Sequence, residues 1–212
     1  MKSEWEMREL LIGNTIRLIA KGGFESATTR AITRVESELP DMKLNDVYIY
    51  RLFGSKENLY HAAFEDLDKE LVRSLSLCIE DIGGLYGNVK EKLFKLFMRT
   101  WRFVLGNEDR CRCYIRYYYS VYFRGESLRQ HNLLFDRIIA VFMPLFKEEA
   151  DVRSIMHSVL TTLLDFAVRV YNGDLEDSDV NAPHVFNVLY CAMVTYFKDG
   201  VLTKGEEASR VI

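Results

Sequence analysis

The chain has 212 residues, of which 49% are apolar and 28% charged, a mix typical of folded globular proteins and unlike that of disordered ones. Its formal charge of −3 means that any nucleic-acid contact must come from a local basic surface. The longest run without Asp, Glu, Lys or Arg, Val180 to Phe197, contains Asn181 and Pro183 and indicates a buried helix, not a membrane span. Acidic residues soon follow Lys2, so we expect no signal peptide and predict a soluble cytoplasmic protein without a membrane partner.

Side chains that cap helix N-termini predict three short helices within the first 55 residues. A capping residue accepts a hydrogen bond from a backbone N–H that the helix leaves without a partner. Glycine after a helix, or proline beyond it, marks its end. The expected starts and ends are Ser3 to Gly22, Thr28 or Thr29 to Pro40, and Asn45 to Leu52.

Apolar stripes at helical spacing predict six further, longer helices, and no segment shows the alternation of a strand. The expected stretches are 55–82, 89–104, 110–123, 127 to about 146 with a kink or end near Pro144, 155–170 and 186–197. The sequence contains no internal repeat or flexible linker. It therefore predicts an all-α fold of about nine helices.

Two motifs near the N-terminus carry a resemblance to a known family. Gly23-Phe24 is followed by Thr28-Thr29 and Ile32, and later by the run Ile49 to Leu59, which reads IYRLFGSKENL. In this order the motifs resemble the DNA-binding domain of TetR-type transcriptional regulators. The sequence departs from the family pattern in two ways: Arg51 stands where a second tyrosine is usual, and the segment between Ile32 and Tyr50 is longer.

The resemblance implies a division of the chain and a function. Residues 1–60 are expected to form a three-helix helix-turn-helix DNA-binding domain. Residues 61–212 are expected to form a larger helical domain that binds an effector and dimerises. The implied function is a DNA-binding transcriptional regulator, a homodimeric repressor released from its operator by a small apolar or aromatic molecule. The alternative is a helical small-molecule-binding protein with degenerate or altered DNA binding.

The expected DNA face combines a recognition helix with phosphate contacts. A helix-turn-helix places its second helix in the major groove, while hydroxyls, cations and helix starts hold the phosphates. Asp46 is the one charge on the recognition helix that does not suit DNA. The alternative is a solvated surface, because residues 1–60 contain nine basic and nine acidic side chains. The expected DNA-binding residues are Thr28, Thr29, Arg30, Lys43, Asn45, Tyr48, Tyr50, Arg51 and Lys56.

Aromatic residues in the middle of the chain suggest an effector site. Five tyrosines lie between residues 114 and 123, and three of them share one face of a predicted helix. Phenol tips around an apolar cavity would suit an aromatic or amphipathic ligand, although the same rings could simply fill the core. Asp165 lies in an apolar run and either pairs with Arg169 or faces the ligand. The expected ligand-binding residues are Phe97, Trp101, Tyr114, Tyr118, Tyr122 and Asp165.

The last two long helices predict the dimer seam. Each carries an apolar stripe, and two such helices at the end of a chain often exceed what one core can bury. The expected interface residues are Val159, Leu163, Phe166, Val170, Phe186, Tyr190, Met193 and Phe197.

The sequence offers no chemistry that would make this chain an enzyme. Cys111 and Cys113 lack the spacing of a zinc or redox motif, so they are buried thiols or, alternatively, a redox-sensing pair. The histidines show no metal spacing, and no phosphate loop, nucleophile elbow or catalytic carboxylate pair is present. We expect no metal and no cofactor.

Overall fold

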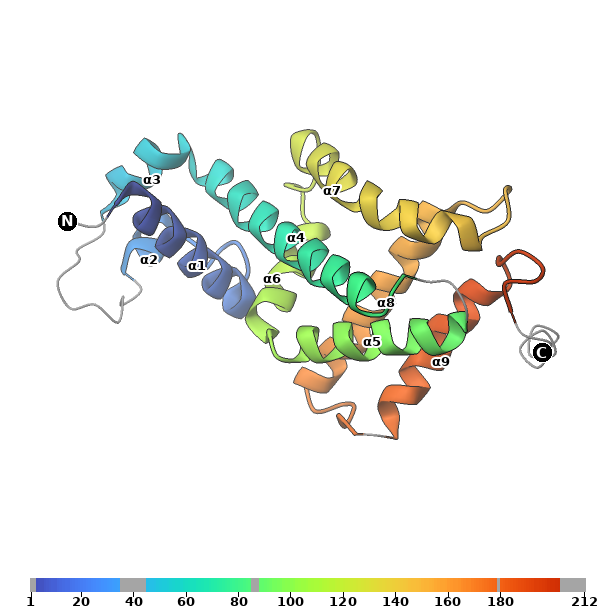
Figure 1. Ribbon diagram of the computed structural model, residues 1–212. Coiled ribbons are helices and arrows are strands. Elements are labelled where there is room, and N and C mark those ends of the chain that lie inside the picture. Colours follow the sequence, from blue (N-terminus) through green and yellow to red (C-terminus); the bar gives the residue numbers. More distant parts are fainter. Residues whose placement is uncertain (1–2, 35–44, 85–87, 179, 203–212) are drawn as a thin grey trace. The chain divides into compact units, whose positions relative to one another are not determined.

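The computed structural model describes residues 3–34, 45–84, 88–178 and 180–202. Within these residues the chain is all-α, as predicted, and contains no strand (Figure 1). The expected DNA contact Lys43 lies outside them. The helices are α1 (Glu4–Gly22), α2 (Thr29–Arg34), α3 (Asp46–Phe53), α4 (Lys56–Asp81), α5 (Val89–Leu105), α6 (Glu108–Tyr118), α7 (Glu126–Phe142), the 3₁₀ helix η1 (Met143–Leu145), α8 (Val152–Tyr171) and α9 (Asn181–Val194).

The described residues fall into two compact units, whose bounds along the chain follow. The first comprises Met1–Glu70 and Asn107–Asn132, and the second Leu71–Gly106 and Leu133–Ile212. Helices α4 and α7 therefore each contribute to both units. The sequence predicted a DNA-binding domain that ends at residue 60 and an effector domain after it, and this functional division stays a prediction. The compact units have other bounds, because residues 107–132 belong with the N-terminal helices.

The predicted N-caps are confirmed. Ser3 and Glu6 form a complete capping box at the start of α1, which satisfies two backbone donors at once. The Asn45 side chain accepts from the Val47 N–H at the start of α3, and Ser55 accepts from the Asn58 N–H in the first turn of α4. Each start was predictable because the capping side chain and the N–H that it accepts from lie within three residues of each other.

The core of the first unit lies between α1, α2, α3 and α6. Helix α1 packs against α6 and α2, and Leu11, Ile19, Ile32 and Ile49 are fully buried. The buried Asn14 donates from Nδ2 to the Ile32 carbonyl over 2.9 Å. This bond joins α1 to α2 and satisfies a carbonyl inside the core, where an unpaired one would be costly.

Helix α6 ends earlier than the sequence predicted. The expected helix ran to Phe123, but α6 stops at Tyr118. The Ser120 hydroxyl donates to the Tyr117 carbonyl and accepts from the Tyr122 N–H, so it satisfies the backbone of the turn. Tyr122 consequently leaves the helical face expected for it, and its ring packs against Phe24 at a centroid distance of 4.8 Å.

The second unit is built on α5, α8 and α9, which pack on one another. Two short segments close it: the Lys198 N–H donates to the Leu145 carbonyl, and the Lys147 N–H donates to the Tyr196 carbonyl, each over 2.9 Å. These two backbone hydrogen bonds bring the buried rings of Phe146 and Phe197 to a centroid distance of 4.9 Å. Among the described helices, none combines the length and the apolar composition needed to cross a lipid bilayer.

Candidate nucleic-acid interface and ligand sites

Helices α2 and α3 are fastened to each other by Asp46. Its carboxylate accepts from the Thr33 hydroxyl over 3.0 Å and from the Thr29 hydroxyl over 3.4 Å. The acid that did not suit a DNA-binding helix therefore links the two helices by hydrogen bonds. Thr29, expected to contact phosphate, is engaged in this bond.

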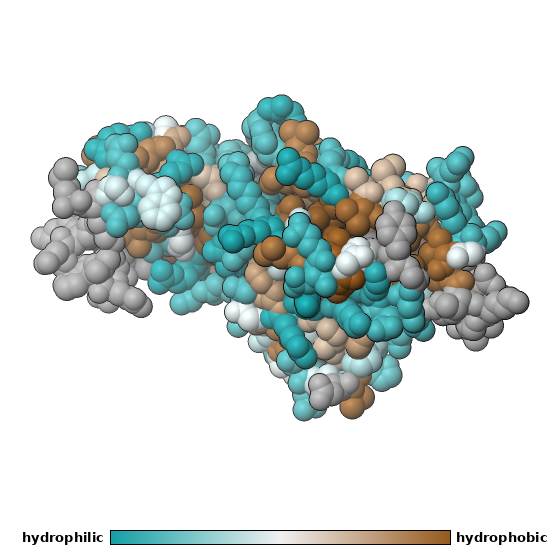
Figure 2. All heavy atoms as spheres, in the orientation of Figure 1, coloured by the Kyte–Doolittle hydropathy of each residue, from teal (hydrophilic) through white to brown (hydrophobic). Residues whose placement is uncertain are grey.

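Helix α3 leaves one face open to solvent. Val47 is 64% and Tyr50 56% exposed, and Arg51 on the next turn is exposed as well, whereas Ile49 and Phe53 are buried. These three exposed side chains lie on one face of the helix. Hydrophilic side chains also predominate over α1 to α3 on the face shown in Figure 2.

Arg51 is held at the protein surface by two neighbours. Its guanidinium lies 4.9 Å from the centroid of the half-buried Tyr48 ring and 3.3 Å from the Glu4 carboxylate of α1. The Tyr48 ring therefore holds the Arg51 guanidinium in place by a cation–π contact. The Asn45 side-chain oxygen is occupied by its capping bond, which leaves its amide N–H groups for other partners.

The C-terminal end of α3 is fixed by two side chains that the sequence did not reveal as functional. Arg8 donates to the Leu52 carbonyl over 3.3 Å, and its guanidinium lies 4.5 Å from the Phe53 ring centroid. Asn58 donates to the Phe53 carbonyl over 2.8 Å. No local signal could have shown the first contact, because Arg8 is 44 residues from Leu52.

The expected phosphate contacts flank this helix. Thr28 is exposed and its hydroxyl accepts from the Ala31 N–H at the start of α2. Arg30 is exposed, and Lys56 begins α4 with its ammonium 5.6 Å from the Tyr60 ring centroid. The structure thus places all the described candidates for DNA contact in the first unit.

The expected ligand-binding residues are divided between the units. Tyr114, Tyr118 and Tyr122 belong to the first, and Phe97, Trp101 and Asp165 to the second. In the first unit Tyr114 stacks on Phe64, with centroids 5.1 Å apart, and Tyr118 packs on Phe123 at 4.3 Å. These tyrosines fill a core of rings, which is the alternative that the sequence left open.

A polar network runs through this aromatic core. The Tyr117 and Ser127 hydroxyls lie 2.9 Å apart, and both contact His61 Nδ1. Burial lowers the pKa of His61 and raises that of Tyr117 to about 12, so both are neutral at pH 7. Beside them, the buried Asp68 lies 3.0 Å from His131 Nδ1, and burial raises the pKa of Asp68.

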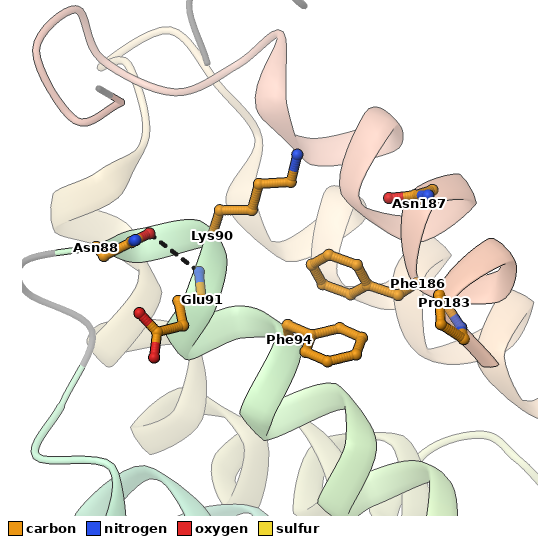
Figure 3. A pocket seen from close by; sticks show the side chains of 7 residues that line it. All are labelled: Asn88, Lys90, Glu91, Phe94, Pro183, Phe186 and Asn187. Carbon is orange, nitrogen blue, oxygen red and sulfur yellow. Dashed lines mark hydrogen bonds between the residues drawn. The ribbon is translucent and has the colours of Figure 1, made fainter. Parts of the chain in front are cut away.

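The second unit carries an open groove between α5 and α9, with a volume of about 370 Å³. Figure 3 shows the Phe94 ring of α5 beside the Phe186 ring of α9, and their centroids are 5.1 Å apart. Pro183 and Asn187 of α9 and Asn88, Lys90 and Glu91 of α5 or its cap complete the lining. The groove thus offers an aromatic floor and a polar rim.

Phe97 and Trp101 lie behind this floor. Phe97 is 5.6 Å from Phe186 and 5.9 Å from Trp101, measured between centroids. Trp101 is buried, and its indole N–H donates to Asp177 over 3.3 Å. The two predicted ligand residues therefore support the groove from within the core and do not line it.

Asp165 is not buried, although it lies in an apolar run of the sequence. It is exposed on α8. Arg169, its expected partner, donates to Asp174 over 2.8 Å, and the bond to Asp174 and the charge of Asp165 both raise the pKa of its guanidinium. The apolar residues around Asp165 face the core while Asp165 itself faces outward, as the helical period allows.

Most of the predicted dimer stripe is core. Leu163, Phe186, Tyr190, Met193 and Phe197 are buried within the second unit, so their side chains are not available to a partner. Of the predicted set, Val159, Phe166 and Val170 remain half-exposed. The exposed face of α9 instead carries Val188, Cys191 and Ala192.

The buried thiol of Cys113 is unsuited to redox sensing. Cys111 and Cys113 are buried and neither forms a disulfide, and burial raises the pKa of Cys113 to about 12. The thiolate is the reactive form, so this thiol is inert at neutral pH. In the part of the chain that the structure describes, no three His, Cys, Asp or Glu side chains gather as metal ligands would.

Comparisons with solved structures assign the fold. A TetR-family transcription regulator from Marinobacter aquaeolei VT8 superimposes with a TM-score of 0.70 at 15% identity, over 87% of this chain and 94% of that one. A TetR-like transcriptional regulator from Rhodococcus sp. RHA1 gives 0.60 at 17% identity, over 87% and 92%. The regulator FadR from Bacillus subtilis, solved with stearoyl-CoA, gives 0.57 at 17% identity, over 85% and 96%.

The sequence matches no protein-family model and no curated protein. The likeness is therefore one of three-dimensional structure. This chain has the all-α fold of TetR-family transcription regulators, with an N-terminal helix-turn-helix segment.

Proposed function

We propose that this chain is a DNA-binding transcriptional regulator, a homodimeric repressor that a small molecule releases from its operator. The observation that carries the proposal is the pair α2 and α3, joined through Asp46, with the side chains of Val47, Tyr50 and Arg51 exposed on one face of α3. A short, rigidly held helix with an open face is what major-groove recognition requires.

The residues divide by the part of DNA that they would contact. Tyr50, Arg51 and the free amide of Asn45 are the candidates for base edges, and Val47 can meet a thymine methyl group. Thr28, Arg30 and Lys56 are the candidates for phosphates, which position the protein without reading sequence.

Dimerisation follows from the need to bind two half-sites about one helical turn of DNA apart. We place the seam on the exposed side of α9, where Val188 is 50% exposed beside Cys191 and Ala192, together with the half-exposed residues Val159, Phe166 and Val170 of α8. Small side chains on α9 would let two copies of that helix approach closely.

The effector is proposed to be an amphipathic molecule with an apolar or aromatic body. The groove of Figure 3 supports this, because its floor is the Phe94–Phe186 pair and its rim carries Lys90. The Lys90 ammonium lies over the Tyr190 ring at 5.1 Å, and no described residue forms an ion pair with it. An acidic end group on the ligand would supply that partner.

A mobility-shift titration with the DNA upstream of its own gene tests the proposal. Tyr50→Ala should reduce the preference for that DNA over a random duplex. Lys56→Ala should weaken binding to both DNAs alike and lower the salt slope by about 1, whereas Lys69→Ala, a matched change of an exposed lysine further along α4, should change neither. A protein that shifts neither DNA would support the alternative, a helical ligand-binding protein without DNA affinity.

A further inference from the structure

A second cavity, distinct from the groove of Figure 3, lies entirely within the first unit. It has a volume of about 350 Å³ and is lined by residues of α1, α4 and α7. The size lies in the range of small-molecule sites. Its walls combine a cation, Arg8, with the apolar side chains of Ala62 and Phe64 and the imidazole of His61.

Of the charged side chains that line this cavity, Arg8 is the one to which no described residue offers an opposite charge. Glu65 pairs with Lys69 and Glu126 with Arg129, each over 2.7 Å, and Asp68 pairs with His131. Arg8 has a carbonyl and an aromatic ring as neighbours, and no described residue gives it a carboxylate. A guanidinium has five N–H donors, of which the Leu52 carbonyl takes one.

The other walls define the rest of the ligand. Ala62 and Phe64 line the cavity with apolar side chains. His61, whose pKa burial lowers, is uncharged at neutral pH. The cavity therefore suits one negative group at Arg8 and a short apolar body beyond it.

The same arginine contacts the end of the proposed recognition helix. Arg8 donates to the Leu52 carbonyl and covers the Phe53 ring, while Asn58, also in the cavity wall, donates to the Phe53 carbonyl. An anion that draws Arg8 toward the cavity competes with both contacts at the C-terminal end of α3. Binding and helix position are then coupled through one side chain.

We infer that this cavity is a binding site for a small organic carboxylate, and that its occupancy alters DNA binding through Arg8. The site differs in place from the proposed effector groove, since the two share no lining residue. The binding step stands by itself, and its effect on DNA rests on the proposed function.

Calorimetric titration of the whole chain with benzoate, and with uncharged benzamide as its isosteric control, tests the site. Benzoate should bind saturably, and benzamide about tenfold or more weakly, because it lacks the charge that Arg8 pairs with. Arg8→Gln should remove this discrimination. Gln130→Glu adds a negative charge to the cavity wall and should weaken benzoate binding while leaving Arg8 in place. Arg17→Gln, a change of an exposed arginine on the same helix, should have no effect.

Two measurements decide the outcome. A thermal melt first shows that each variant is folded, and a DNA titration with and without benzoate then reports the coupling. Benzoate should shift DNA affinity several-fold in the parent and not in Arg8→Gln. Equal binding of benzoate and benzamide, or benzoate binding that both variants retain, would overturn the inference, and so would bound benzoate that leaves DNA affinity unchanged. A parent that binds benzoate but no DNA would support the site and contradict the proposed function, so the two failures can be told apart.

Discussion

Removing the Glu4 carboxylate should strengthen DNA binding. Glu4 holds Arg51 at 3.3 Å in an ion pair whose side chains are 72% and 50% exposed. Exposed pairs of this kind contribute about 0.2–1 kcal/mol, and Arg51 must give up this energy to bind DNA. Glu4→Gln keeps the shape of the side chain and removes the competition, so affinity should rise about 1.4- to 5-fold.

Fluorescence anisotropy with a labelled random duplex and with the upstream DNA measures this change. The matched control is Glu9→Gln, which removes an exposed acid from the same helix and reports the general effect of one less negative charge. A thermal melt is needed as well, because an acid in the first turn stabilises a helix by about 0.3–1 kcal/mol.

A double-mutant cycle with Arg51→Gln isolates the pair. The gain from Glu4→Gln should vanish once Arg51 is uncharged. If Glu4→Gln strengthens binding equally in both backgrounds, or no more than Glu9→Gln does, then Arg51 is not restrained by Glu4 and the reasoning is refuted.

Three further outcomes are expected. Trp101→Ala should cost about 3–5 kcal/mol of stability in urea unfolding, since the side chain is buried; a cost under about 1 kcal/mol would contradict its place in the core. Val188→Glu should turn a dimer into a monomer by light scattering, whereas Leu77→Glu, at an equally exposed site on α4, should not; a dimer that survives refutes the proposed seam. Burial raises the pKa of Asp68, so the folded state binds a proton that the unfolded chain has released, and stability should fall as pH rises from about 4 toward the folded pKa. Asp68→Asn should flatten that slope, and an unchanged slope would show that another group causes it.

Capping residues and apolar periodicity predicted the helices, whereas contacts between residues far apart in sequence were not predictable from them. Ser3, Asn45 and Ser55 cap helices as expected because each accepts a hydrogen bond from an N–H no more than three residues away. The end of α6 was missed because the Ser120 hydroxyl bonds to the backbone of the turn, after which Tyr122 packs against Phe24, about a hundred residues earlier. Periodicity cannot register such a contact.

The candidate sites were predicted less well than the fold, for the same reason. The stripe on α9 was correctly identified as apolar, but a stripe does not say whether a neighbour in the same chain or a second copy covers it. Here Phe94 and Phe97 of α5 pack on Phe186 and bury it. Asp46 looked unsuited to its helix because its partners, Thr29 and Thr33, lie 17 and 13 residues away.

The packing of α1 against α6 bears on how the chain is made. Arg116 of α6 donates to the Ile19 carbonyl at the end of α1 over 2.8 Å, which joins residues 97 positions apart. Synthesis proceeds from the N-terminus, so α1 leaves the ribosome well before α6, which packs on it. Contacts this distant in sequence also form slowly. A nascent chain that has released only residues 1–70 therefore exposes the side of α1 that α6 covers, and the proposed DNA-binding segment becomes complete only after residues 107–132 have emerged.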